Sequence, residues 1–194
     1  MEKYIPRLID SVLKIRLELY GAVLIAGPKW CGKSITAKQC AQSVLELQNS
    51  RTRENNLEIA KNRPDFLLEG LKPRLIDEWQ DAPMLWDSVR YDVDNTGLKN
   101  QYILTGSATY REDKPMHTGT GRIVRLLMRT MSLYETGDST GEVSLNQLFE
   151  DTEDIKGIST LELEDTAFLC ARVGWPGTIG VSTSGALTTA RDYL

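Results

Sequence analysis

Eight consecutive residues near the start of the chain have the types and spacing of a phosphate-binding loop. Residues 27–34 read Gly-Pro-Lys-Trp-Cys-Gly-Lys-Ser, a complete G-x-x-x-x-G-K-S pattern. In such a loop the glycines permit a tight backbone path, the lysine reaches the β- and γ-phosphates, and the serine hydroxyl binds Mg²⁺. The pattern therefore predicts a polyphosphate site in which Lys33 supplies the charge and Ser34 is a metal ligand.

The flanking residues support this interpretation over a chance glycine turn ending in Lys-Ser. Residues 22–26 are short, uncharged and apolar, as expected for a strand buried on both faces of a parallel sheet. From Ile35 onward the pattern suits a helix, whose N-terminus would point backbone N–H groups at an anion. The residues expected to contact the nucleotide are Gly27, Pro28, Lys29, Trp30, Cys31, Gly32, Lys33, Ser34 and Ile35.

Two adjacent carboxylates follow a second apolar segment. Asp77 comes at the end of an expected strand, where it suits an indirect Mg²⁺ partner that holds a metal-bound water on the side opposite Ser34. Glu78 follows directly and could orient or deprotonate an attacking water. Solvated acids are also common at strand ends, so the pair alone does not indicate a catalytic site. The preceding phosphate-binding loop is what favours the catalytic interpretation.

A third polar group is expected at the same edge of the sheet. Ser107 follows Gly106 at the end of the expected strand 101–105. It could touch the γ-phosphate or the attacking water, or it could simply turn the chain. Because parallel strands end at one edge, where open α/β sheets bind ligands, the sequence predicts that Ser107 lies beside the loop.

Composition limits the classes of protein to consider. The 194 residues include 23 Lys and Arg against 27 Asp and Glu, a net charge of −4 that gives no general attraction to nucleic acid or anionic membranes. No apolar stretch approaches the ~20 residues that span a bilayer, and the first residues do not resemble a signal peptide.

Three cysteines without metal-ligand spacing fit reduced thiols in the cytoplasm. Cys31 is read as a passive loop residue, with a thiol pKa lowered by Lys33 as the alternative.

Alternation of strand and helix patterns predicts a three-layer α/β domain with a mainly parallel sheet. After about residue 137 the organisation weakens to a surface loop, a helix and a small polar run at 178–186, with a further helix beginning near residue 190. The expected strands cover 22–26, 44–48, 74–76, 101–105 and 122–128, a loop covers 109–121, and the expected helices cover 7–19, 35–44, 51–62, 82–92 and 161–173.

Several segments, in order, resemble one family: the predicted AAA+-superfamily ATPases of prokaryotes in which an AAA domain precedes a C-terminal domain of unknown function. The resemblance covers nearly all of the chain. It is carried by residues 4–10, 27–34, 74–83, 102–108, 119–123, 131–135 and 174–177.

This resemblance implies a P-loop NTPase sheet in the order 5-1-4-3-2, with Asp77-Glu78 as Walker B and Ser107 near the sensor-1 position. It also makes Arg122, which lies between the fourth and fifth strands, a candidate arginine finger. Such a residue acts on the transferred phosphoryl group across the interface of a homo-oligomer. A structural or surface arginine is the equal alternative.

Family members are longer, and this chain stops where their C-terminal region begins. We therefore assign residues 1–150 to a P-loop AAA+-type ATPase domain and 151–194 to the start of an incomplete helical or lid region. The expected activity is Mg²⁺-dependent hydrolysis of ATP to ADP, weak in an isolated fragment, driving a conformational change in a partner or substrate that the sequence does not identify. The alternatives are a nucleotide-dependent signalling switch with little turnover and a motor or loader acting on nucleic acid.

Overall fold

The computed structural model describes residues 4–107, 121–150 and 156–193. The chain divides into two compact units, Met1–Arg129 and Thr130–Leu194. The domain boundary expected from the sequence at residue 150 stays a prediction. The expected loop at 109–121 lies outside the described residues, apart from Gly121.

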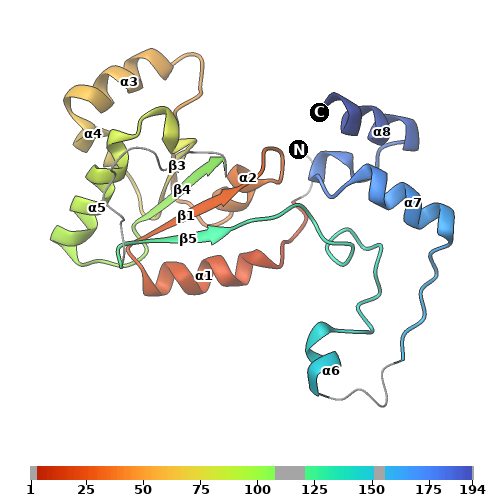
Figure 1. Ribbon diagram of the computed structural model, residues 1–194. Helices are drawn as coiled ribbons and strands as arrows, with labels where there is room; N and C mark the ends of the chain where they lie inside the picture. Colours follow the sequence, from red (N-terminus) through yellow and green to blue (C-terminus); the bar gives the residue numbers. More distant parts are fainter. Residues whose placement is uncertain (1–3, 108–120, 151–155, 194) are drawn as a thin grey trace. The chain divides into compact units, whose positions relative to one another are not determined.

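A five-stranded parallel sheet forms the centre of the first unit (Figure 1). Its order is β2-β3-β4-β1-β5, which read from the other edge is the expected 5-1-4-3-2. The internal strand β1 is buried along its whole length, as its uncharged sequence predicted, and lies between β4 and β5. The strands are β1 (Ala22–Gly27), β2 (Ser43–Glu46), β3 (Arg74–Asp77), β4 (Tyr102–Ser107) and β5 (Ile123–Leu127).

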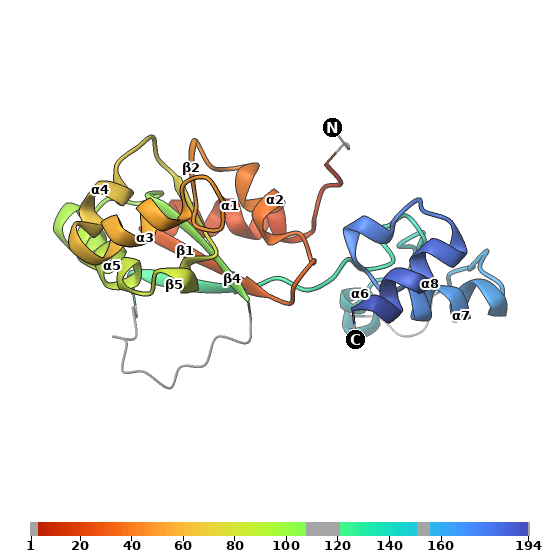
Figure 2. The same ribbon diagram turned by 90° about the horizontal axis from the view of Figure 1, so that it is seen from above.

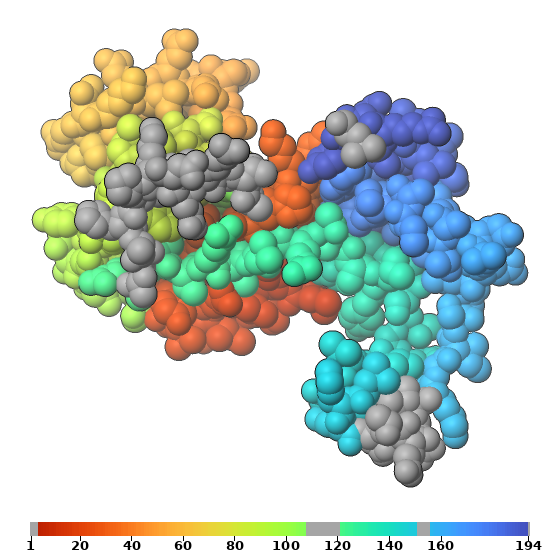
Figure 3. All heavy atoms as spheres, viewed as in Figure 1, coloured from red at the N-terminus to blue at the C-terminus, as the bar shows by residue number. Residues whose placement is uncertain are grey.

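Helices cover both faces of this sheet, which confirms the three-layer α/β architecture. Alternate residues of β1 enter two separate apolar clusters: Leu24 packs with residues of α3, α4 and α5, whereas Val23 and Ile25 pack with residues of α1 and α2. Figures 1 and 2 show the helices on either side of the sheet, and Figure 3 shows α3 and α4, in light orange, against α5 in yellow-green. The helices are α1 (Ile9–Leu19), α2 (Lys33–Lys38), α3 (Arg53–Asn62), α4 (Pro64–Leu68) and α5 (Met84–Thr96), with a 3-10 turn η1 (Trp79–Asp81).

Some element boundaries differ from the sequence prediction. The helix after the loop ends at Lys38, before the expected residue 44, because the chain turns there into β2. Pro64 was expected to end a helix, and it also begins the short α4, since proline needs no N–H donor in the first turn of a helix. Ser107 was expected after its strand and is instead the last residue of β4.

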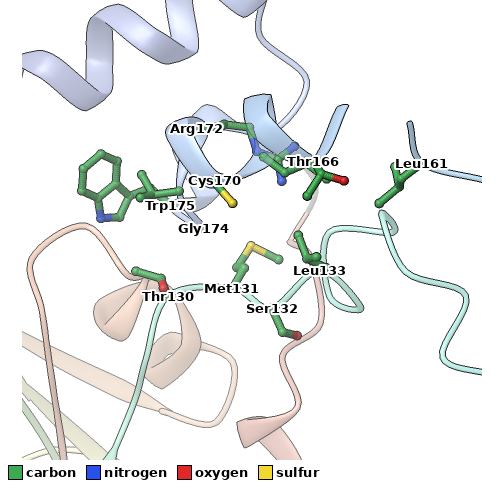
Figure 4. A pocket seen from close by; sticks show the side chains of 12 residues that line it. Thr130, Met131, Ser132, Leu133, Leu161, Thr166, Cys170, Arg172, Gly174 and Trp175 are labelled. Carbon is green, nitrogen blue, oxygen red and sulfur yellow. The ribbon is translucent and has the colours of Figure 1, made fainter. Parts of the chain in front are cut away.

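The second unit contains α6 (Leu145–Glu150), α7 (Leu163–Arg172), a 3-10 turn η2 (Pro176–Thr178) and α8 (Thr183–Asp192). The last helix was expected near residue 190 but begins at Thr183, because the Ser182 side chain caps it by accepting a hydrogen bond from Gly185 N. A mainly apolar cavity of about 430 Å³ lies between residues 130–133 and α7 (Figure 4). Within the described part of the chain, no helix has the length and apolar character needed to cross a membrane.

Candidate functional site

The phosphate-binding loop connects the buried strand β1 to the N-terminus of α2. Gly32 adopts φ 98°, a left-handed conformation that glycine reaches without steric cost, and α2 begins at the next residue, Lys33. Gly27 is required for a different reason: a Cβ on it would lie 2.1 Å from the backbone oxygen of Met128. The two glycines therefore set the path of the loop, one through its dihedral angles and the other through packing.

The Lys33 side chain folds back over the loop. It is only 6% exposed. Its Nζ donates to the backbone oxygens of Gly27 at 3.1 Å and Pro28 at 2.8 Å. An ammonium group has three donors, so it can exchange neutral carbonyl partners for a phosphate without leaving the loop. The geometry of Lys33 therefore fits a polyphosphate.

Ser34, Asp77 and Thr105 meet beside the loop. Ser34 Oγ donates to Asp77 Oδ1 at 2.6 Å, and the hydroxyl of the fully buried Thr105 donates to the same oxygen at 2.5 Å. Hydroxyl and carboxylate oxygens are the ligands that Mg²⁺ takes, usually together with waters and substrate phosphates. Ser34 and Asp77 fit that role, and among the described residues no group of three His, Cys, Asp or Glu side chains could hold a metal ion instead.

Thr105 was not singled out from the sequence. A polar residue inside an otherwise apolar strand was the available signal. The register of β3 on β4 pairs Ile76 with Leu104, which brings the next residues, Asp77 and Thr105, together. The positions at which strands end in the sequence do not predict which residues of β3 and β4 pair.

Glu78 follows β3 in a left-handed backbone conformation, with φ 57° and ψ 52°. For a residue other than glycine such a conformation costs on the order of 1–3 kcal/mol and persists where the surroundings impose it. Two contacts hold Glu78 here: its N–H donates to Thr105 Oγ1 at 3.2 Å, and its carboxylate accepts from Gln80 Nε2. Gln80 is a second polar contact that sequence reasoning missed.

The structure brings Ser107 to the loop as expected. In the parallel pairing of β1 with β4, Ser107 lies opposite Gly27, the first residue of the loop. The preceding Gly106 has no room for a side chain, since a Cβ there would lie 2.7 Å from Trp79 Nε1. The positions of Ser34, Asp77, Glu78 and Ser107 thus converge at the carboxyl edge of the sheet, although their chemical roles stay predictions.

Arg122 lies at the opposite edge. It precedes β5, whose first residue pairs with Ala22, the first residue of β1. The length of β1, ~17 Å at 3.3 Å per residue, therefore separates Arg122 from the loop that follows this strand. Its Nε donates to Asp94 Oδ1 on α5 at 2.5 Å, in a half-exposed ion pair. The structure does not bring Arg122 to the phosphate-binding loop of its own chain.

The remaining loop residues divide between surface and interior. Trp30 and Ile35 are each 55% exposed, so both are accessible to a bound nucleotide. Cys31 is fully buried, and burial raises the pKa of its thiol despite the opposing charge of Lys33. The alternative of a lowered thiol pKa at Cys31 is therefore wrong, and the cysteine is a buried part of the loop.

Comparison with known proteins agrees with this site. A family model described as an AAA domain matches residues 20–137, more than half of the chain and the part that holds the loop. No curated protein matches the sequence. Similar solved structures include that of C. elegans PCH-2, with 13% sequence identity and a TM-score of 0.39 over 93% of this chain and 58% of that one. The present chain thus spans less than two thirds of that protein's length. On the family match, the chain belongs to the AAA domain family and is an ATPase-like member of the AAA+ superfamily.

Proposed function

We propose that this chain is the ATP-binding domain of an AAA+-type ATPase that hydrolyses ATP to ADP and phosphate and thereby drives a conformational change in a protein partner. One observation carries the proposal. Lys33, Ser34 and Asp77 stand at the carboxyl edge of the sheet, with the Ser34 hydroxyl 2.6 Å from the Asp77 carboxylate. We place the protein in the cytoplasm because its three cysteines are free thiols.

Each side chain has a distinct proposed role. The loop amides and Lys33 bind the phosphates, while Ser34 and Asp77 hold Mg²⁺, which when bound neutralises phosphate charge. Glu78 orients the attacking water and accepts its proton. Ser107 contacts the γ-phosphate or that water, and Arg122 completes the site of a neighbouring subunit.

Nucleotide binding is tested by comparing two lysines of α2. Lys33→Ala removes the buried ammonium and should weaken ATP and ADP binding by ~1.5–3 kcal/mol, roughly 10- to 150-fold. Lys38→Ala is the matched control, because Lys38 is exposed on the same helix and paired with Glu46 at 2.6 Å. Isothermal titration calorimetry gives both affinities. Wild-type affinity in a folded Lys33→Ala variant would overturn the assignment of the loop.

A nucleotide-dependent switch with little turnover is the second candidate. It is favoured by the Gln80 amide, which donates to Oε2 of Glu78 and so occupies one of the two carboxylate oxygens that could accept a proton. Multiple-turnover phosphate release distinguishes the two functions, since a switch binds nucleotide at the same site but releases almost no phosphate.

A further inference from the structure

Arg7 lies behind the phosphate-binding loop, on the segment that precedes α1. The side chain is buried, with only 8% of the residue exposed. Its Nη1 donates to the backbone oxygen of Cys31 at 2.7 Å, inside the loop, and its Nη2 donates to the backbone oxygen of Arg129 at 2.9 Å. One guanidinium thus joins the loop to the residue at the end of the first unit.

The same side of the loop has a second support. Met128 N donates to Ala26 O at 2.8 Å, and the Met128 oxygen faces Gly27 so closely that no Cβ would fit between them. The Cys31 thiol also lies 3.9 Å from that oxygen. The segment 128–129 therefore forms a backing for the loop, and Arg7 ties Cys31 to this backing.

The contact with Cys31 has a geometric consequence for the next residue. The Cys31 carbonyl and the Gly32 N–H belong to one peptide group, which is planar, and in a trans peptide they point in opposite directions. The structure has a cis peptide only at Lys72-Pro73 among its described residues, so the bond between Cys31 and Gly32 is trans. A donor that holds the carbonyl oxygen at the back of the loop therefore directs the Gly32 N–H away from Arg7.

We propose that Arg7 is a positioning residue for the anion site: by holding the Cys31 carbonyl, it aims the Gly32 N–H at the phosphates. This inference rests on the proposed nucleotide binding. Backbone N–H groups in such loops bind phosphate oxygens, and an amide already oriented does so without reorganisation. Arg7 itself stays outside the phosphate site.

The test compares Arg7→Ala with Arg16→Ala. Arg16 is the matched control because its Nη1 also donates to a backbone oxygen, that of Arg125 in β5, away from the loop. We expect ADP affinity, measured by calorimetry on the full chain, to fall about 10-fold in Arg7→Ala, the scale of one charge-assisted hydrogen bond. It should stay within about 2-fold of wild type in Arg16→Ala.

Two further measurements separate positioning from general stability. Methylguanidinium at low millimolar concentration should restore part of the ADP affinity of Arg7→Ala and leave that of the wild type unchanged. In ¹⁵N-glycine spectra, ADP should shift the Gly32 amide less in Arg7→Ala than in wild type or Arg16→Ala. If Arg7→Ala does not fold, Arg7→Lys replaces it, because lysine keeps the charge and a donor. This variant should lose less ADP affinity than expected for Arg7→Ala, and ADP should again shift its Gly32 amide less than in the wild type.

The outcomes are distinct. Wild-type ADP affinity and an unchanged Gly32 shift in the folded Arg7 variant would overturn the positioning role, even if its melting temperature fell. Absence of ADP binding in the wild-type chain and in Arg16→Ala would instead overturn the proposed function, and this inference with it.

Discussion

Asp77 and Asp94 lie at opposite edges of the sheet and are held by different means. At the carboxyl edge, Asp77 accepts hydrogen bonds from the hydroxyls of Ser34 and Thr105. At the amino edge, Asp94 pairs with the guanidinium of Arg122. Neutral donors fix a carboxylate without cancelling its charge, whereas an ion pair neutralises it. Asp77 therefore keeps a negative charge that can attract a metal ion, whereas the charge of Asp94 is balanced by Arg122.

Chain order explains which residues reach which edge. In a parallel sheet every strand starts at one edge and ends at the other, so residues after β1, β3 and β4 meet, and a residue before β5 lies far from them. Arg122 can therefore serve a nucleotide only if that nucleotide belongs to another subunit. The following predictions test this difference between the edges, beginning with the largest effect.

Removing Arg122 should have the largest effect on turnover if the residue is supplied in trans. Arg122→Ala should lower ATP hydrolysis by ~10³-fold or more while leaving nucleotide binding nearly unchanged. Wild-type activity per subunit should rise with protein concentration, and mixing Arg122→Ala with Lys33→Ala should restore some activity, because one complete site can form at a mixed interface. Phosphate release measures the loss in Arg122→Ala, the concentration dependence of the wild type and the recovery on mixing.

The partner of Arg122 supplies the control. Asp94→Asn removes the ion pair and keeps the arginine, so a finger role predicts hydrolysis close to wild type in this variant. A structural role predicts that Asp94→Asn and Arg122→Ala lower the melting temperature alike, with activity independent of concentration and no recovery on mixing. That result would end the oligomeric mechanism.

At the carboxyl edge, Glu78→Gln should reduce hydrolysis by ~10²-fold, because the amide keeps the size of the side chain but cannot accept a proton. ATP affinity should be retained. Steady-state phosphate release and calorimetry separate the two quantities in the complete protein. Turnover at the wild-type rate would mean that another group activates the water.

Asp77→Asn should have a smaller effect, confined to the metal. An amide oxygen can still accept from Ser34 and Thr105, but the negative charge is lost, so the Mg²⁺ concentration for half-maximal activity should rise ~10-fold. A Mg²⁺ titration at fixed ATP measures it. Thr105→Ser keeps the hydroxyl and should reach half-maximal activity at the same Mg²⁺ concentration as wild type. An unchanged Mg²⁺ concentration for half-maximal activity in Asp77→Asn would show that Asp77 does not take part in metal binding.

The smallest effect concerns two tyrosines, one near each edge. Burial raises the pKa of Tyr4, which contacts Thr36 on α2, to about 12, and burial with the Asp92 hydrogen bond raises the pKa of Tyr102. The folded chain thus holds both phenol protons more tightly than the unfolded chain does. Their stabilisation is complete below pH ~10 and is lost for Tyr4 between ~10 and about 12, at under ~1.4 kcal/mol per pH unit.

Urea unfolding between pH 8 and 11 measures this dependence. Tyr102→Phe and Tyr4→Phe should each flatten the decline of the unfolding free energy at alkaline pH. Identical slopes in wild type and both variants would show that neither hydroxyl is responsible.

The sequence predicted the elements whose signals are local. The buried strand β1 and the G-x-x-x-x-G-K-S spacing each lie within a few residues, and the resemblance to a family supplied the strand order. Contacts that depend on register or on distant segments were missed. Thr105 contacts Asp77 only because β3 pairs with β4. Arg7 contacts Arg129 although the two residues are 122 positions apart in the sequence. The start of α8 was missed because the cap at Ser182 lies in a run of small polar residues.

The close approach of Gly27 to Met128 changes how loss of function at this motif should be interpreted. Packing inside the protein requires the first glycine of the pattern, because any side chain there would collide with the backbone after β5 even without a bound nucleotide. A variant at this position that fails to bind ATP therefore reports on folding as much as on recognition. Lysine and serine variants, whose side chains face the proposed ligand, are the informative probes of the same motif.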